Sequence, residues 1–251
     1  MNLNLIGKNA LVTGSSKGIG KAIAKGLHAE GCNIMLNGRN ISELKKIAED
    51  LGERVSFFIA DVTIPQDCRS LVDAMINRWG SLDVLVCNVG SGKSVKPGEE
   101  NLEEWKNVFN KNLFSTTNMV EAATKELAKS HGSIVCISSI SGIEVTGAPV
   151  TYSASKAALN AYVKGIARHL AQQGIRINAV APGNVLFKGS VWEKKLSENP
   201  AYVQNLLKNE VALNRFGSTE EIANLVTFLA SPLTTFATGA VFVLDGGQLR
   251  S

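Results

Sequence analysis

The sequence predicts an α/β fold in which one doubly wound sheet of seven mostly parallel strands carries helices on both faces. Short apolar runs alternate with longer amphipathic stretches along all 251 residues, as in repeated strand–helix units. The apolar runs are rich in Val, Ile, Leu and Phe at successive positions, which is typical of strands covered on both sides. The length suits one α/β unit, and no Pro-, Gly- or Ser-rich linker divides the chain, so we expect a single domain over residues 1–251.

The expected strands and helices follow one another in regular order. Strands are predicted near residues 9–13, 33–37, 55–60, 84–88, 133–138, 176–181 and 240–244. Helices are predicted to begin near Gly18, Ile41, Gln66, Leu102, Tyr152 and Thr219, with Asn40 and Ser218 as N-caps. The connection 182–217 is much longer than an ordinary strand–helix connection, so we predict a substrate lid at about 186–212.

Charge and leader patterns restrict the classes of partner. The 26 Lys and Arg residues exceed the 22 Asp and Glu residues by a formal charge of +4, but they are interspersed with acids in amphipathic stretches such as 41–54 and 99–129. We therefore expect no nucleic-acid partner. The first residues have no secretory-signal pattern and no window approaches eighteen apolar residues, so we expect a cytoplasmic protein without membrane association.

The cysteines give no sign of a metal site. Cys32, Cys68, Cys87 and Cys136 have no CxxC or other metal-ligand spacing, and three of them lie in stretches predicted to be buried strands. We expect reduced, buried thiols and no bound metal.

A glycine-rich turn follows the first predicted strand, where residues 13–20 are TGSSKGIG. Glycines there allow a tight turn and let a pyrophosphate approach the backbone, and the N-terminus of the next helix favours an anion. A strand-to-helix turn can also need glycine for its own geometry alone. The candidate cofactor-binding residues are Gly14, Ser16, Lys17, Gly18, Ile19 and Gly20.

The end of the second predicted strand indicates which dinucleotide binds. An acid there would bond the 2′-hydroxyl of NAD, but the sequence is Asn37-Gly38-Arg39. The planar guanidinium of Arg39 suits a 2′-phosphate, and Lys17 adds a second positive charge nearby. This pattern predicts NADP(H), although Arg39 could instead be a solvated residue that opens a helix.

Four polar residues form a candidate catalytic group. Tyr152 and Lys156 are four residues apart on a predicted helix and so share one of its faces. Ser139 directly follows the fifth predicted strand, and Asn112 lies in a long predicted helix after the fourth. Each could be structural by itself, but all four follow the carboxyl ends of strands, where open α/β sheets bind ligands.

Together, TGxxxGIG, Tyr152-x3-Lys156 and the Pro182-Gly183 turn resemble the short-chain dehydrogenase/reductase family over essentially the whole chain. The resemblance implies a Rossmann-type fold and an NADP(H)-dependent oxidoreductase that interconverts a ketone and a secondary alcohol. It implies a catalytic tetrad of Asn112, Ser139, Tyr152 and Lys156. Tyr152 would donate or accept the proton, Ser139 would donate to the carbonyl oxygen, Lys156 would bind the ribose and lower the phenol pKa, and Asn112 would help hold a water.

The same resemblance implies further cofactor contacts and an assembly. Asp61 and Val62 would contact the adenine, and the backbone near Gly183 and Val185 would face the nicotinamide carboxamide. Asn88 and Gly90 match the family's Asn-Asn-Ala-Gly turn, in which this chain departs at two positions, Cys87 and Val89. The terminal Leu244-Asp245-Gly246-Gly247 resembles a turn at the family's tetramer interface, so we expect a homotetramer.

Substrate identity is left open by the sequence. Within the family the chain resembles 3-oxoacyl thioester reductases, but only one of the two positions that face an acidic carrier protein, Lys129 and Gln173, is basic. The alternative is a polar or anionic keto compound such as a sugar derivative. The lysines that favour this alternative could equally be solvated. The residues concerned are Lys93 and Lys96 in the loop after the fourth predicted strand, and Lys188, Trp192, Lys194 and Lys195 in the predicted lid. A non-catalytic NADP(H)-binding sensor or scaffold is the alternative from a different class.

Overall fold

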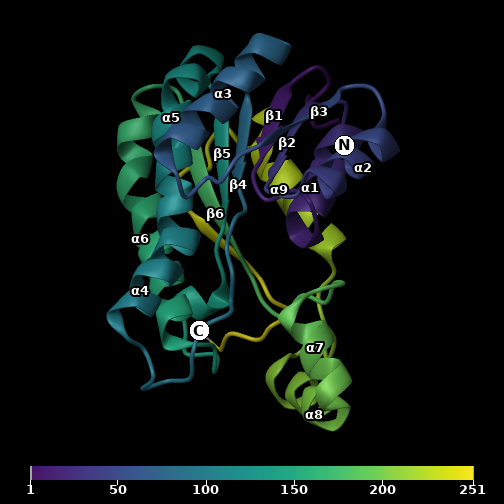
Figure 1. The fold of residues 1–251 in the computed structure, drawn as a ribbon, viewed down its shortest axis with the longest axis vertical. Helices are drawn as coiled ribbons and strands as arrows, with labels where there is room; N and C mark the ends of the chain where they lie inside the picture. The colour runs from purple at the N-terminus through teal and green to yellow at the C-terminus, as the bar shows by residue number, and fades with distance from the viewer. Residues whose placement is uncertain (1, 251) are drawn as a thin grey trace.

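The computed structural model describes residues 2–250 and contains one seven-stranded sheet in the order β3-β2-β1-β4-β5-β6-β7 (Figure 1). The seven predicted strands are confirmed, and every pairing is parallel. The strands are β1 Asn9–Val12, β2 Asn33–Gly38, β3 Val55–Ile59, β4 Val84–Cys87, β5 Ser133–Ile137, β6 Arg176–Pro182 and β7 Val241–Leu244. Since the order reverses direction between β1 and β4, the strand ends there form the crevice in which this architecture binds ligands.

Helices cover both faces of the sheet, as predicted. In Figure 1, α3, α5 and α6 lie on one side and α1, α2 and α9 on the other. Each set packs on its own apolar core. The helices are α1 Gly18–Ala29, α2 Ile41–Leu51, α3 Pro65–Trp79, α4 Leu102–Phe109, α5 Ser115–Ser130, α6 Val150–Ala171, α7 Val191–Glu198, α8 Pro200–Glu210 and α9 Thr219–Ala230.

The strands contribute side chains to both apolar cores. In β2, Ile34 and Leu36 belong to the core under α1, α2 and α9, whereas Met35 belongs to the core under α3, α5 and α6. Successive side chains of a strand point to opposite faces, so one strand supplies both cores. This explains why the strands are continuous apolar runs in the sequence.

The predicted helix starts agree with the structure to within two residues. Four begin at the predicted residue, α3 begins at Pro65 instead of Gln66, and α6 begins at Val150 instead of Tyr152. The Asn40 side chain caps α2 by accepting from the backbone N–H of Ser42, and Ser218 opens α9 with a capping box.

Two segments differ from the prediction. The long helix expected after β4 is divided into α4, a π-helical segment Asn110–Phe114 and α5, and Asn112 lies in the π-helical segment. Residues 186–212, predicted to be a lid, contain two helices that were not predicted, α7 and α8, which are capped by the side chains of Ser190 and Asn199.

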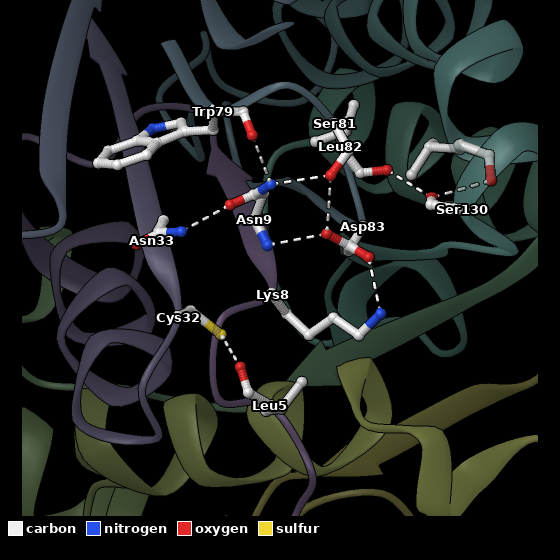
Figure 2. Close-up of polar contacts among 11 residues, drawn as sticks. Leu5, Lys8, Asn9, Cys32, Asn33, Trp79, Ser81, Leu82, Asp83 and Ser130 are labelled. Carbon is white, nitrogen blue, oxygen red and sulfur yellow. Dashed lines mark hydrogen bonds and ion pairs between the residues drawn. The ribbon is translucent and has the colours of Figure 1, made fainter.

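A polar network joins the amino ends of β1, β2 and β4 (Figure 2). The Asp83 carboxylate accepts from Lys8 Nζ at 2.8 Å and from the Asn9 backbone N–H at 2.9 Å. The Asn9 side chain donates to Ser81 Oγ at 2.8 Å and accepts from Asn33 Nδ2 at 2.8 Å. These side chains satisfy one another's hydrogen-bonding groups, so the network at the amino ends of the strands is structural. The candidate site lies at the carboxyl ends of the strands.

All four cysteines are buried, as predicted. Cys87 and Cys136 lie in strands, Cys32 directly precedes β2, and Cys68 lies in α3, so the prediction of three strand cysteines is wrong for one of them. Burial raises the pKa of the Cys32 and Cys68 thiols to about 12. Within residues 2–250, no helix is long and apolar enough to cross a membrane, and no group of side chains is arranged to hold a metal ion.

Candidate active site

The carboxyl ends of the strands open into a cavity of about 650 Å³, a volume in the range of small-molecule and cofactor sites. The structure brings every predicted site residue except Asn112 to the wall of this cavity. These lining residues are Gly14, Ser16, Lys17, Gly18, Ile19, Gly20, Arg39, Asp61, Val62, Asn88, Gly90, Ser139, Tyr152, Lys156, Gly183 and Val185.

The glycine-rich turn is shaped for close approach of an anion. Gly14 and Gly18 have φ angles of 60° and 54°, and a Cβ on Gly20 would lie 2.5 Å from the Gly14 carbonyl oxygen. α1 has no side-chain cap, unlike α2, α7, α8 and α9, and its first turn contains no acid. Its first N–H groups and the positive end of its dipole therefore face the cavity unneutralised, which fits a dinucleotide pyrophosphate.

Asn37 holds this turn from below, a role that the sequence pattern did not reveal. It is fully buried, its carbonyl accepts from Ser15 N–H at 2.8 Å, and its own N–H donates to Ser15 Oγ at 2.9 Å. Its side-chain amide donates to the carbonyls of Phe58 and Ala60 at 3.3 and 3.2 Å. One residue thus connects the ends of β1, β2 and β3. An amide inside an apolar run was the only sequence signal.

Replacing Asn37 with Ala should destabilise the protein by about 2–3 kcal/mol, because two carbonyls and the Gly14 N–H would lose their partner. Urea unfolding measures the change as a lower midpoint at constant slope. Asn205→Ala, on the exposed face of α8, is the control and should change the free energy of unfolding by less than about 0.5 kcal/mol. An equally small change for Asn37→Ala would show that the turn does not depend on this amide.

The turn after β4 is bonded directly to the glycine-rich turn. Thr13 Oγ1 accepts from the Asn88 backbone N–H at 2.9 Å, and Asn88 Nδ2 donates to the carbonyls of Thr13 and Gly14 at 3.0 and 3.1 Å. Val89 packs against Gly14, where an added Cβ would lie 3.0 Å from the valine Cγ2. Asn88 therefore fixes the position of one turn against the other.

Arg39 lies at the edge of the cavity and is available to a ligand. Its side chain is 76% exposed, and one guanidinium nitrogen lies 3.4 Å from the Asp61 carboxylate. Burial raises the pKa of Asp61, but hydrogen bonds from Thr63 and the charge of Arg39 outweigh it and hold the pKa below its usual value. Since an exposed ion pair contributes about 0–1 kcal/mol, Arg39 could exchange this partner for a phosphate at little cost.

Ser139, Tyr152 and Lys156 meet where β5 ends and α6 begins. The Ser139 side chain accepts from the Ser141 N–H at 3.2 Å, and Tyr152 lies in the first turn of α6. Lys156 is buried one turn later, and its Nζ lies 5.9 Å from the centre of the Tyr152 ring. The ammonium donates to the Ile137 carbonyl at 2.8 Å.

The environment determines the charge of each group. Burial raises the pKa of Tyr152, and a hydrogen bond with Ser139 opposes this only in part. Burial lowers the pKa of Lys156 to about 8. At neutral pH the phenol is therefore protonated, which is the form that can donate a proton to a substrate. Lowering of the phenol pKa by Lys156 and a bound nicotinamide stays a prediction for the loaded protein.

Asn112 is buried behind the cavity wall and holds one of its loops. Its Oδ1 accepts from the Ser91 N–H at 2.9 Å, and its Nδ2 donates to the carbonyls of Ser91 and Val108 at 3.1 and 3.0 Å. A Cβ on Gly90 would lie 2.8 Å from Asn112 Oδ1 and 3.2 Å from Lys156 Nζ, so this close approach needs glycine. Both amide hydrogens are used, and the water-holding role stays a prediction.

Asn160 is a second supporting residue that the sequence pattern did not reveal. It lies one turn after Lys156 on α6, where its Oδ1 accepts from Ser138 Oγ at 2.6 Å and its Nδ2 donates to the Gly142 carbonyl at 3.1 Å. These bonds hold the segment that carries Ser139 against the helix that carries Tyr152.

The segment predicted to be a lid, residues 186–212, contributes aromatic and apolar side chains to the cavity. The ring of Phe187 packs against Gly18, where an added Cβ would lie 2.5 Å from the ring. The Trp192 ring lies 5.4 Å from the Phe216 ring. The lid residues that line the cavity are Phe187, Ser190, Val191, Trp192, Lys195, Tyr202 and Leu206.

Comparisons with known proteins agree with this arrangement. A family model described as enoyl-(acyl carrier protein) reductase matches residues 14–248. The chain is 36% identical to a 3-oxoacyl-[acyl-carrier-protein] reductase of Chlamydia muridarum, covering 99% of this chain and 100% of the relative. It is 34% identical to glucose 1-dehydrogenase 2 of Bacillus subtilis, covering 99% and 97% of the two chains.

Solved structures of similar proteins contain a nicotinamide cofactor. The L-sorbose reductase of Gluconobacter frateurii was solved with NADPH and L-sorbose. It is 29% identical to this chain with a TM-score of 0.94, and the comparison covers 100% of both chains. A 7α-hydroxysteroid dehydrogenase solved with NADH has a TM-score of 0.91 and 28% identity, with 100% of this chain and 97% of that chain covered.

Proposed function

This chain belongs to the short-chain dehydrogenase/reductase family and is an oxidoreductase that acts on CH–OH groups with NAD(P), and we propose that it interconverts a ketone and a secondary alcohol with NADP(H). The observation that carries the proposal is the meeting of a protonated Tyr152, Ser139 and a buried Lys156 at one cavity wall. A protein that only sensed the cofactor would not need this group of side chains.

The proposed chemistry assigns one task to each side chain. When bound, the nicotinamide supplies a hydride to the carbonyl carbon in reduction or accepts it in oxidation. Ser139 donates a hydrogen bond to the carbonyl oxygen, and Tyr152 gives that oxygen a proton as negative charge develops on it. Lys156 keeps a positive charge beside the phenol, which favours the phenolate left behind. Asn112 keeps the loop at Ser91 in place.

We propose NADP(H) as the preferred cofactor, on the basis of Arg39 and Lys17 at the cavity and the absence of an acid at Gly38. Arg39→Ala should weaken NADPH binding by about ten- to a hundred-fold, equivalent to about 1.5–3 kcal/mol, and leave NADH binding nearly unchanged. Titrations of the wild type and of Arg39→Ala with NADPH and with NADH measure this change. Arg69→Ala, on the exposed side of α3, is the control. Equal affinity of the wild type for NADPH and NADH would contradict the assignment.

We propose that residues 186–212 act as a lid that closes over bound substrate. No residue of α7 and only Val203 of α8 is fully buried, so few apolar contacts stabilise this segment without a ligand. Amide hydrogen exchange across the lid should slow when NADPH and a product analogue bind, while exchange in α5 stays the same. Unchanged exchange in the lid would show that it does not close.

A substrate screen tests the proposed activity. Relatives named for 3-oxoacyl-carrier-protein and for sugar substrates favour two classes, 3-oxoacyl thioesters and keto sugars. Purified protein is mixed with NADPH and with members of each class and small diketones, and NADPH oxidation is followed by absorbance. We expect oxidation with at least one class. Tight NADPH binding without oxidation by any ketone would instead indicate a sensor or scaffold.

We further propose a homotetramer in the cytoplasm. Apolar side chains are exposed on α9 and around β7, where Phe236 is fully exposed, and β7 leads into the Leu244–Gly247 turn that resembles a tetramer contact. The other exposed members are Phe228, Leu233 and Val243.

A further inference from the structure

Cations dominate the charged lining of the cavity. Among residues 2–250, the lining of the cavity includes one acid, Asp61, and this acid already pairs with Arg39. Lys17 and Arg39 lie on the glycine-rich turn and after β2, at the end of the cavity proposed for the adenosine and the phosphates. The remaining cations are Lys111, Lys156 and Lys195.

Lys195 lines the cavity from α7, and a chain of contacts leads from it to the turn after β6. Its Nζ is 4.6 Å from the centre of the Trp192 ring, and that ring is 5.4 Å from the Phe216 ring. The next residue, Gly217, donates to the Asn184 carbonyl at 2.9 Å. This chain of contacts connects Lys195 to the turn after β6, which is proposed to face the nicotinamide and hence the reacting carbonyl.

The acids of the lid have other partners. Glu193 accepts from the Gly189 N–H at 2.6 Å, Glu198 pairs with Lys194 at 3.5 Å, and Glu210 pairs with Arg250 at 3.5 Å. None of the ion pairs formed within residues 2–250 includes Lys195. An ammonium over an aromatic face keeps its N–H donors for another acceptor.

The neighbouring lysine shows that this arrangement is specific to one position. Lys194 has a side chain that is 75% exposed, pairs with Glu198 and does not line the cavity. Lys195 lines the cavity, is half-buried and lies over the Trp192 ring, so water screens its charge less than that of Lys194.

We propose that Lys195 binds an anionic group of the substrate, so that the preferred ketones carry a carboxylate or a phosphate. The proposal rests on the proposed ketone–alcohol activity and assigns it a substrate class. The cofactor phosphates do not need Lys195, because the free N-terminus of α1, Lys17 and Arg39 already supply positive charge for them.

The test compares matched charged and neutral ketones. Linear oxo acids with the ketone at carbon 2, 3, 4 or 5 are assayed beside their methyl esters. Dihydroxyacetone phosphate is assayed beside dihydroxyacetone. The wild type should show a kcat/KM at least tenfold higher for the charged member of one pair, and the pair shows whether carboxylate or phosphate is bound. Lys195→Met should remove this preference through KM, with NADPH affinity unchanged, and Lys194→Met should behave as the wild type.

Two results would overturn the proposal: equal kcat/KM for charged and neutral members in the wild type, or an equal loss on both in Lys195→Met. If no ketone is reduced, the proposed activity has failed, and calorimetric titration of the NADP⁺ complex with 4-hydroxypentanoate and its methyl ester decides about Lys195. Tighter binding of the acid that is lost in Lys195→Met supports an anion site. Equal binding of acid and ester excludes one.

Discussion

Replacing Tyr152 with Phe should lower kcat by about a hundred-fold or more while the fold and NADPH affinity stay unchanged, because general acid catalysis contributes roughly 10²–10⁴ in rate. The substitution keeps the ring and removes the oxygen that would protonate the substrate. Steady-state kinetics with the best ketone, together with NADPH titration, measures both effects.

Tyr162→Phe is the matched control for this experiment. Tyr162 lies on the same helix as Tyr152 but does not line the cavity, so loss of its oxygen should leave kcat unchanged. A Tyr152→Phe protein that reduces the ketone at nearly the wild-type rate would contradict the assignment of the proton donor.

Replacing Lys156 with Met should lower kcat by about a hundred-fold, since mutations that remove one positioned donor from a buried reaction site cost about 10²–10³. The side chain is of similar length, so the buried space stays filled. NADPH affinity should fall as well, by about tenfold, if the ammonium also binds the ribose. Lys164→Met, on the exposed side of the same helix, is the control.

The pH dependence provides an independent check on Lys156. Because its pKa is lowered from 10.5 to about 8, the free protein loses this charge as pH rises through about 8. The wild-type kcat/KM for NADPH should fall there, and Lys156→Met should lack that step. Between about 8 and 10.5 the unfolded chain binds the proton that the folded chain has released, so this lysine makes stability rise with pH. A wild-type profile identical to that of the variant would contradict a charged, functional Lys156.

The strands and most helix starts could be predicted because they depend on local pattern. Strands covered on both faces are continuous apolar runs, and Asn40 and Ser218 are side chains with strong N-cap preference. The lid helices were missed although Ser190 and Asn199-Pro200 carry the same cap signals, because α7 and α8 bury few residues and so have a weak apolar pattern.

The remaining differences depend on contacts between distant segments. The π-helical turn occurs where Asn112 bonds both Val108 in the preceding helix α4 and Ser91 in another loop, and helical periodicity carries no information on the second contact. Asn37 and Asn160 bond backbone atoms more than fifteen residues away, so only the folded chain shows their role. The grouping of Ser139, Tyr152 and Lys156 was expected from family resemblance, and the structure brings them to one cavity.

Hydride transfer between NADPH and a ketone is tested most directly by isotope tracing. The protein is incubated with its best ketone and with NADPH that carries deuterium on either face of nicotinamide C4, and the alcohol product is analysed by mass spectrometry and NMR. The proposed function predicts one deuterium on the carbinol carbon from one face only, and almost none with Tyr152→Phe. Recovery of unreacted ketone only, without labelled alcohol, from a protein that binds NADPH would contradict the proposed function.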